Sequence, residues 1–116
     1  MEKLNKYIEH TLLKQDATKA DLVKLFDEAK ENDFLGVCIN PCYVKMAKEY
    51  LKDTDVKVVT VIGFPLGANT TETKIFETIQ AIKDGADEID MVINDTKVKD
   101  HDTDFIVEEI KLIKAA

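Results

Sequence analysis

Hydrophobic and polar positions alternate along this chain in four successive pairs of segments. Each pair has a short apolar run of strand length, followed by a longer segment with apolar residues at helical spacing. The apolar runs are residues 7–13, 35–40, 56–64 and 88–94, and the third is rich in β-branched residues. The pattern predicts the element order β-α-β-α-β-α-β-α.

Capping and turn residues indicate where the helices begin and end. Thr18, with Asp21 three residues later, is typical of a capping box. Pro41 suits the first turn of the second helix, Thr70 suits the start of the third, and Gly85 suits its end. The apolar residues at helical spacing are Leu22, Leu25, Phe26 and Ala29, then Val44, Ala47 and Leu51, then Ile75, Ile79 and Ile82, and, in a last helix from about Thr103, Ile106, Ile110 and Ile113.

Such alternation predicts an α/β fold with a parallel sheet, right-handed crossovers and helices on its outside. Two architectures satisfy it, a small open doubly wound sheet and a piece of a closed (β/α)8 barrel. A complete barrel needs about 250 residues. The chain has 116, and we expect residues 1–116 to form a single domain.

Composition narrows the function classes. Lys and Arg number 16 against 23 Asp and Glu, a net charge of −7, which argues against a nucleic-acid or acidic-membrane partner but leaves an anionic small molecule open. Two cysteines fit a reducing compartment better than a disulfide scaffold. No apolar run has the length of a signal peptide or a membrane span, so we expect a cytoplasmic protein.

Asp90 is the first candidate for chemistry. Alternation puts it on one face of the fourth run with Glu88 and Asn94, opposite the apolar Ile89 and Met91. The apolar face suits helix packing, so Asp90 is expected to point to the other side, which in a barrel is the interior. A carboxylate there is costly to bury unless paired, which indicates either proton transfer or a buried ion pair.

Other polar residues give weaker signals. Cys38 and Asn40 share a face of the second run, and Cys38, without an obvious base beside it, is interpreted as a small buried hydrophobe. Cys38, Cys42 and the two histidines do not complete a metal-ligand set, so no metal is expected. We interpret His10 as a hydrogen-bonded structural histidine and His101 as a solvated loop residue.

The loop at residues 63–69 (GFPLGAN) lies between the third strand and the third helix. It matches neither the phosphate-binding nor the dinucleotide-binding glycine pattern. Its glycines are therefore interpreted as conformational.

Four stretches together closely resemble the bacterial deoxyribose-phosphate aldolase family. They are residues 7–14 (YIEHTLLK), 37–41 (VCINP), 60–67 (TVIGFPLG) and 85–94 (GADEIDMVIN). The resemblance runs in order over essentially the whole chain and implies the first four β/α units of a (β/α)8 barrel. Two stretches depart from the family pattern: Glu9 stands where Asp is more usual, and residues 95–100 replace a loop of small residues.

The resemblance also implies an activity. The family cleaves 2-deoxy-D-ribose 5-phosphate to D-glyceraldehyde 3-phosphate and acetaldehyde through a Schiff base on lysine, with no cofactor and no metal. By motif position, Asp90 is the catalytic carboxylate that moves protons, and Thr11, Cys38 and Asn40 are candidates for lining the substrate site. The family's Schiff-base lysine, a second lysine and the phosphate site belong to later β/α units.

The sequence therefore predicts that one chain lacks a complete aldolase site. The lysines near strand ends and loops are expected to be ordinary solvated side chains: Lys14, Lys45, Lys57, Lys97 and Lys99. Three readings stay open. The chain is part of an aldolase that needs a further half, a non-catalytic half-barrel that self-associates as a homodimer through its exposed edges, or a small flavodoxin-like binding domain.

Overall fold

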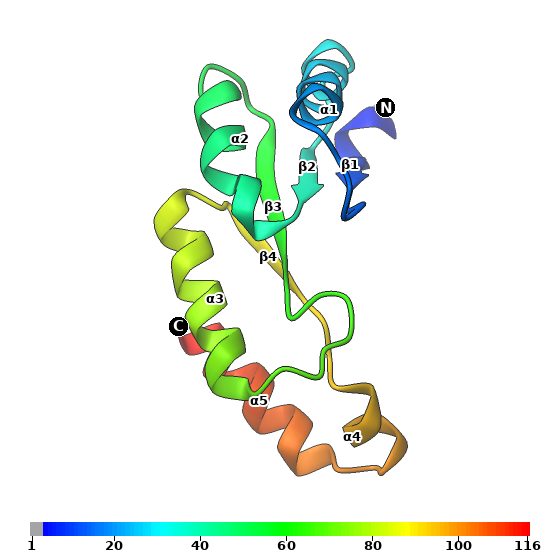
Figure 1. Ribbon diagram of the computed structural model, residues 1–116, viewed down its shortest axis with the longest axis vertical. Coiled ribbons are helices and arrows are strands. Elements are labelled where there is room, and N and C mark those ends of the chain that lie inside the picture. The colour runs from blue at the N-terminus through cyan, green and yellow to red at the C-terminus, as the bar shows by residue number, and fades with distance from the viewer. Residues whose placement is uncertain (1–3) are drawn as a thin grey trace.

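The computed structural model describes residues 4–116, so residues 1–3 of the predicted domain lie outside the described part. Helices and strands alternate as expected, with additions at both ends of the chain (Figure 1). In chain order they are η1 (Leu4–Tyr7), β1 (Glu9–Leu12), α1 (Lys19–Glu31), β2 (Gly36–Ile39), η2 (Pro41–Tyr43), α2 (Val44–Tyr50), β3 (Lys57–Ile62), α3 (Thr71–Asp84), β4 (Glu88–Met91), α4 (Asp95–Lys99) and α5 (Thr103–Ala115).

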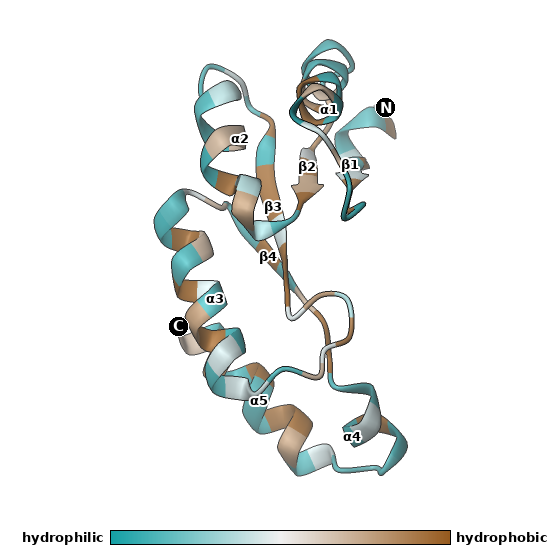
Figure 2. Cartoon of the chain, in the orientation of Figure 1, coloured by the Kyte–Doolittle hydropathy of each residue, from teal (hydrophilic) through white to brown (hydrophobic). Residues whose placement is uncertain are grey.

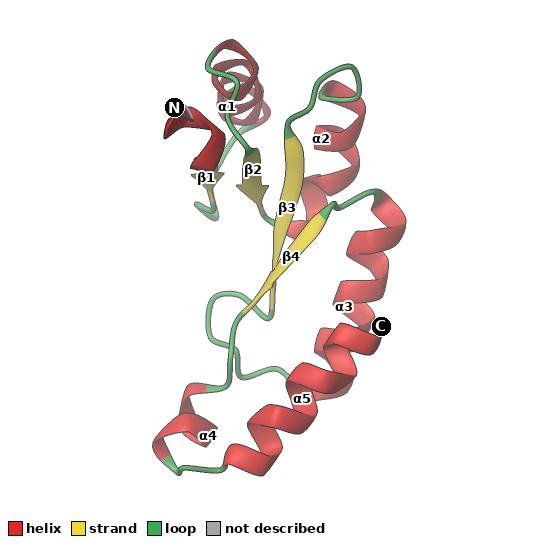
Figure 3. Cartoon of the chain, turned by 180° about the vertical axis from the view of Figure 1, so that it is seen from behind, coloured by secondary structure: helices red, strands yellow, loops and turns green. Residues whose placement is uncertain are grey.

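The four strands form one parallel sheet in the order β1-β2-β3-β4, so each strand pairs with the next one along the chain (Figure 3). Parallel neighbours need a crossover, and α1, α2 and α3 supply the three crossovers. The prediction of successive β/α units with a parallel sheet is confirmed.

The first helix follows the sequence pattern closely. Thr18 accepts a hydrogen bond from the backbone N–H of Asp21, and the Asp21 carboxylate accepts one from the Thr18 N–H, which completes the capping box. Both bonds satisfy backbone donors at the start of the helix. The hydrogen bond that the Asp21 carboxylate accepts from the Thr18 N–H, followed by that from the Thr18 hydroxyl, lowers the pKa of the Asp21 carboxyl. The buried residues of α1 are the predicted ones: Leu22, Leu25, Phe26 and Ala29.

The hydrophobic core lies between the sheet and the first two helices. Val37 and Val58 point from the sheet into this core, where they meet Phe26 of α1 and Val44 of α2. Pro41 opens a 3-10 turn that leads directly into α2, as its position at the start of a helix predicts. Figure 2 shows hydrophobic residues along the strands beneath these helices.

The third helix is where predicted, but its buried face is not the apolar one. Thr70 caps it, and Gly85 ends it in the left-handed conformation. The predicted stripe contributes little to the core, since Ile79 is 51% and Ile82 49% exposed. The residues buried on α3 are Lys74, Thr78 and Ala81.

The strands at both ends of the sheet are shorter than the apolar runs. The first run was expected from residue 7, but residues 4–7 form η1 and β1 spans Glu9–Leu12. The fourth run ends as a strand at Met91, because Asn94 caps a further short helix, α4, by accepting a hydrogen bond from the Lys97 N–H. The predicted single helix after the fourth strand is therefore two helices.

Candidate functional site

The sheet has an open face, defined here as the face opposite the helices, which carries Thr11, Cys38, Glu88 and Asp90. Thr11 pairs with Cys38, Cys38 with Val59, and Val59 with Glu88, so these residues form one row across the four strands. Residues paired in this way point to the same side of a parallel sheet. The predicted side for Asp90, away from the helices, is therefore confirmed.

Asp90 lies one residue before the carboxyl end of β4, opposite Val61. The sequence predicts a barrel interior for it, but its side chain is exposed because β4 is the last strand of the sheet. Within residues 4–116 no side-chain hydrogen bond or ion pair holds its carboxylate. The carboxylate is therefore free to meet a ligand on the open face, near the end of the sheet where α/β proteins bind their ligands.

Acidic residues give the open face its electrostatic character. The pKa of the Glu9 carboxyl is raised, first by partial burial and then by the negative charges of Glu88 and Asp90. Burial, followed by the charges of Asp90 and Glu9, raises the pKa of the Cys38 thiol to about 11. Cys38 is 5% exposed and stays a thiol at neutral pH, so it is a poor nucleophile and packs as the expected small hydrophobe.

The two remaining candidates occupy the carboxyl ends of β1 and β2. Thr11 is exposed, and its hydroxyl donates to the Glu9 carbonyl 3.0 Å away, which leaves the Thr11 oxygen able to accept from a ligand. Asn40 directly follows β2, and its Nδ2 lies 3.4 Å from the Leu13 carbonyl oxygen. Asn40 therefore ties the end of β2 to the segment after β1.

Neither histidine is on the open face. His10 Nε2 lies 3.4 Å from Glu28 Oε1 of α1, and its ring meets the edge of Phe34 at 5.5 Å between centroids. This confirms the interpretation of His10 as a hydrogen-bonded structural residue. His101 is exposed at a turn with φ of 57°.

The glycines of the loop after β3 have conformational roles, as expected. Gly63 and Gly67 have φ of 68° and 66°, and the Gly67 N–H donates to the Gly63 carbonyl at 2.7 Å. A Cβ on Gly67 would lie 2.1 Å from the Ile93 carbonyl oxygen. The loop thus packs directly against the segment that follows β4, which only a glycine permits.

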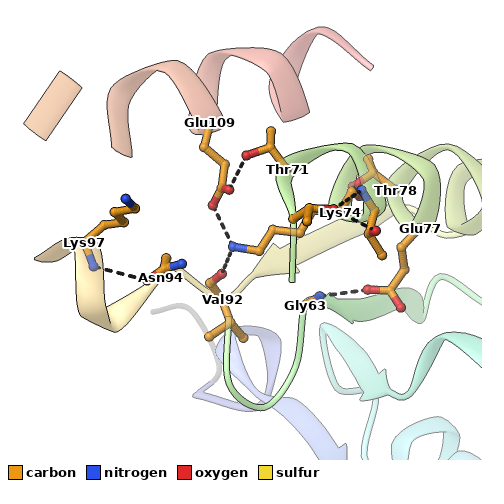
Figure 4. A network of polar contacts seen from close by, with 11 residues as sticks. Gly63, Thr71, Lys74, Glu77, Thr78, Val92, Asn94, Lys97 and Glu109 are labelled. Atoms are coloured by element: carbon orange, nitrogen blue, oxygen red, sulfur yellow. Dashed lines mark hydrogen bonds and ion pairs between the residues drawn. The ribbon is translucent and has the colours of Figure 1, made fainter. Parts of the chain in front are cut away.

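Sequence reasoning missed a buried ion pair behind the carboxyl end of β4 (Figure 4). Lys74 Nζ of α3 lies 2.6 Å from Glu109 Oε1 of α5 and donates to the Val92 carbonyl at 3.1 Å. The Thr71 hydroxyl donates to the other Glu109 oxygen at 2.6 Å. The side chains of Lys74 and Glu109 are 0% and 2% exposed. This network joins α3, α5 and the end of β4, two residues beyond Asp90.

A signal for this pair exists in the sequence. Glu109 interrupts the stripe of Ile106, Ile110 and Ile113 on α5, and Lys74 lies one turn before Thr78 on α3. A single acid and a single base at inward positions of neighbouring helices are the pattern that pairs when buried.

The lysines singled out from sequence lie at the surface. Lys14, Lys45, Lys57 and Lys99 are exposed. Lys97 is partly exposed, lies 4.8 Å above the Phe105 ring and approaches Asp102 at 3.8 Å. The only fully buried lysine within residues 4–116 is Lys74, whose ammonium is already paired.

Two kinds of feature are absent from the described part of the chain. Residues 4–116 contain no cluster of three or more His, Cys, Asp or Glu side chains arranged to hold a metal ion. No described helix is both long and apolar enough to cross a membrane.

A parallel sheet whose strands follow one another in chain order, with helices on one face and, on the other, acidic residues of the outer strands on either side of a small apolar cluster, defines part of a (β/α) barrel. The model of the DeoC/LacD family aldolases matches residues 4–116. The chain belongs to this aldolase family.

Relatives and solved structures agree with this assignment. The chain is 60% identical over 114 residues to the deoxyribose-phosphate aldolase of Clostridium botulinum and 55% identical over 116 residues to that of Ureaplasma urealyticum. These matches cover 98% and 100% of this chain but 54% of each relative, so the chain spans about half the length of the curated relatives it matches.

The crystal structure of a putative deoxyribose-phosphate aldolase from Coccidioides immitis superposes with a TM-score of 0.94 at 36% identity, over 97% of this chain and 44% of that one. The tetrameric deoxyribose phosphate aldolase of Aeropyrum pernix superposes with a TM-score of 0.73 at 34% identity, over 78% of this chain and 38% of that one. These neighbours are TIM barrels, and this chain corresponds to a partial barrel.

Proposed function

We propose that this chain supplies the first four β/α units of a deoxyribose-phosphate aldolase and that Asp90 is its proton-transferring carboxylate. The observation that carries the proposal is the position of Asp90, unpaired on the open face beside the carboxyl end of β4. The relatives named deoxyribose-phosphate aldolase, at 55–60% identity, support the choice of substrate, 2-deoxy-D-ribose 5-phosphate.

The chemistry requires two kinds of group. A lysine amine attacks the C1 aldehyde of the open-chain sugar and releases water, forming an iminium. The C2–C3 bond then breaks as the C3 hydroxyl gives its proton to a base, and the bonding electrons move into the iminium to form an enamine. D-Glyceraldehyde 3-phosphate leaves, C2 of the enamine takes a proton, and water releases acetaldehyde and the free lysine. Asp90 is the carboxylate that accepts and returns protons in this sequence.

The lysine is proposed to come from strands beyond the four described here. The one fully buried lysine among residues 4–116 is held by Glu109 on the helix side of the sheet, and the lysines singled out from the sequence lie at the surface rather than on the open face beside Asp90. The chain alone is therefore expected to be inactive. Incubation with the substrate and borohydride, followed by mass spectrometry, should give no reduced adduct. An adduct on a single lysine of this chain would contradict this part of the proposal.

A chimera tests the role of Asp90. Residues 1–116 replace the matching half of the Clostridium botulinum relative, and formation of D-glyceraldehyde 3-phosphate is measured. Asp90→Asn should lower kcat by about 10²–10⁴-fold, the usual contribution of a general acid or base. Glu88→Gln, on the same face of the same strand, is the matched control and should stay within about threefold of the parent chimera. Equal activity of Asp90→Asn and the parent would overturn the assignment.

A second candidate function, self-association of a non-catalytic half-barrel, is supported by the sheet edges. β1 and β4 each pair with one neighbour only, which leaves a row of backbone donors and acceptors on each. Pairing of these edges between two copies would satisfy them. Because Ile8 bonds to β2, Glu9 faces the free edge of β1; Glu9→Pro should therefore weaken such pairing, and sedimentation equilibrium would show unchanged association if the edges are not used.

A further inference from the structure

One helix, α3, reaches the carboxyl ends of both β3 and β4 through charged side chains. The Glu77 carboxylate accepts from the Gly63 N–H at 2.7 Å, directly after β3. The Lys74 ammonium donates to the Val92 carbonyl at 3.1 Å, directly after β4. Figure 4 shows both bonds. Because Lys74 and Glu77 lie one turn apart on the same helix, α3 sets the end of β4 relative to the end of β3.

The Lys74 side chain is fixed along its length. Its ammonium pairs with Glu109 Oε1 of α5 at 2.6 Å, and its carbon chain packs against Gly63, where an added Cβ would lie 3.0 Å from Lys74 Cε. The side chain is 0% exposed, so bulk water does not compete for the Val92 carbonyl. A charge-assisted hydrogen bond that is shielded from water in this way is stronger than an exposed one. Lys74 therefore holds the Val92 carbonyl at a fixed place.

The position of Asp90 depends on the backbone on either side of it. Its carboxylate is exposed and, in the part of the chain that the structure describes, has no side-chain partner. Before Asp90 the strand is paired with β3, but β4 ends one residue later. The next residue, Val92, is held by its N–H, which donates to the Ile62 carbonyl at 2.8 Å, and by its carbonyl, which accepts from Lys74. The segment also contacts Gly67. Of these three contacts, the Lys74 bond is the one that ties the segment to a helix.

We infer that Lys74 is a positioning residue for Asp90 and acts by holding the Val92 carbonyl, and this inference rests on the proposed catalytic role of Asp90. A proton-transferring carboxylate has to lie within hydrogen-bond reach of the proton that it moves. A displacement of about 1 Å can lower the rate about 10²-fold. Lys74 lies on the helix side of the sheet and Asp90 on the open face, so the effect of Lys74 on the reaction passes through the backbone.

A double variant separates this role from stability. Lys74→Met/Glu109→Leu removes both buried charges, so neither is left unpaired, but the Val92 carbonyl loses its donor. In the chimera described above, which supplies the proposed lysine, it should lower kcat about ten- to hundredfold and leave KM within about threefold. Urea unfolding of the chain itself should show that the double variant keeps most of its stability.

Glu109→Gln gives the opposite combination. It weakens the buried ion pair but leaves the Lys74 bond to Val92 in place, so it should lower stability and keep kcat within about threefold of the parent chimera. Lys48→Met is the matched control at the other end of β4. It removes an ammonium that lies 3.1 Å from Asp87, just before that strand, and kcat should again stay within about threefold.

A double-mutant cycle tests whether Lys74 acts through Asp90. Asp90→Asn alone should lower kcat about 10²–10⁴-fold. Adding Lys74→Met/Glu109→Leu to Asp90→Asn should lower kcat less than about threefold further, because a carboxylate that is absent cannot be misplaced. A purely structural role of the pair would multiply the two losses instead.

Three outcomes would overturn the inference. They are a double variant with the kcat of the parent chimera, losses that multiply in the cycle, and a loss with Glu109→Gln as large as that of the double variant. The last outcome would show that activity follows stability rather than the bond to Val92. Failure of the proposed function gives a different result, because Asp90→Asn would then be as active as the parent chimera, and both conclusions would fall.

Discussion

The two halves of the helix layer stabilise this protein by different means. Beneath α1 and α2, the sheet packs on a continuous apolar core that includes Leu22, Phe26 and Val44. Beneath α3 and α5, the buried positions include an ion pair, Lys74 with Glu109, and most of the larger apolar residues of these helices are partly or fully exposed, with Ile113 buried. The first region is stabilised mainly by the burial of apolar surface, whereas the second depends on a few hydrogen bonds and one ion pair with fixed geometry.

Because of this difference, we expect the second region to tolerate fewer substitutions than the first. An apolar core tolerates changes of side chain that keep its volume, because its contacts are not directional. A buried ion pair tolerates no loss of one partner, because the remaining charge has neither water nor a counter-ion. The segment just after β4 is held by the hydrogen bond from Lys74 Nζ to the Val92 carbonyl, by the bond from the Val92 N–H to the Ile62 carbonyl and by its contact with Gly67, and the first of these depends on the buried ion pair.

The largest effect is expected from breaking the ion pair. Lys74→Met leaves the Glu109 carboxylate buried without a partner and should lower the free energy of unfolding by about 3–5 kcal/mol. Lys48→Met is the matched control, because Lys48 pairs with Asp87 at 3.1 Å but is half exposed, and it should cost less than about 1 kcal/mol. Urea unfolding measures both.

The double variant Lys74→Met/Glu109→Leu sharpens this result, because it removes both charges and should recover most of the lost stability. A Lys74→Met protein as stable as the parent would show that the pair is not desolvated in solution.

Shortening an apolar side chain should destabilise the protein more in the first region than in the second. Leu22→Ala leaves a cavity in the α1/α2 core, where Leu22 is 1% exposed, and should cost about 2–5 kcal/mol. The same change at Leu112 of α5, which is 42% exposed, should cost less than about 1 kcal/mol. Similar losses at both positions in thermal unfolding would mean that a second copy or another partner covers α5 in solution.

The same contrast explains which features could be predicted from the sequence. Thr18, Asp21 and the apolar face of α1 are encoded locally, within two or three turns of one helix, so periodicity and capping rules were sufficient. The buried face of α3 is set by a partner 35 residues away, and the polar pair gives no hydrophobic period. Periodicity therefore selected Ile79 and Ile82, which are exposed.

The candidate site also has one feature that follows from local sequence and others that do not. The face on which Asp90 lies follows from the alternation of side chains along a strand, which is a local rule. Its exposure depends on whether other strands stand opposite, and no local rule contains that information. The short helix α4 was missed because Asn94, assigned to the strand run by its position in an apolar segment, acts as a helix cap.

The two N-caps allow a finer test of whether the regions unfold together. Thr18→Ala and Thr70→Ala remove the capping oxygens of α1 and α3, and each should cost about 1 kcal/mol. Hydrogen exchange followed by mass spectrometry should show faster exchange in the first turn of the affected helix only. If Thr70→Ala speeds exchange in α1 as much as in α3, the two regions form one cooperative unit and the contrast between them is only structural.

The smallest expected effect concerns the open face, where acidic side chains of the two regions repel each other. Glu9 of β1 belongs to the first region and Glu88 and Asp90 of β4 to the second, and their mutual repulsion adds to burial in raising the pKa of the Glu9 carboxyl. A folded-state pKa above the unfolded one means that the group contributes stability while protonated and loses this contribution as pH rises through the folded pKa. Glu9→Gln removes the charge and should therefore stabilise the protein by a few tenths of a kcal/mol at about pH 7, with no gain at about pH 3.

The control for this change is Glu108→Gln, at an exposed position in the middle of α5, which removes one charge away from both the open face and the helix ends and should show no such gain at neutral pH. Thermal unfolding of both variants across this pH range gives the comparison. The sign of the Glu9 result is informative in itself, because a basic group on the open face, supplied by a second copy or by further strands, would favour the Glu9 carboxylate. Glu9→Gln would then destabilise the protein at neutral pH, and that reversal would show that the acidic side chains of the two regions share a cationic partner.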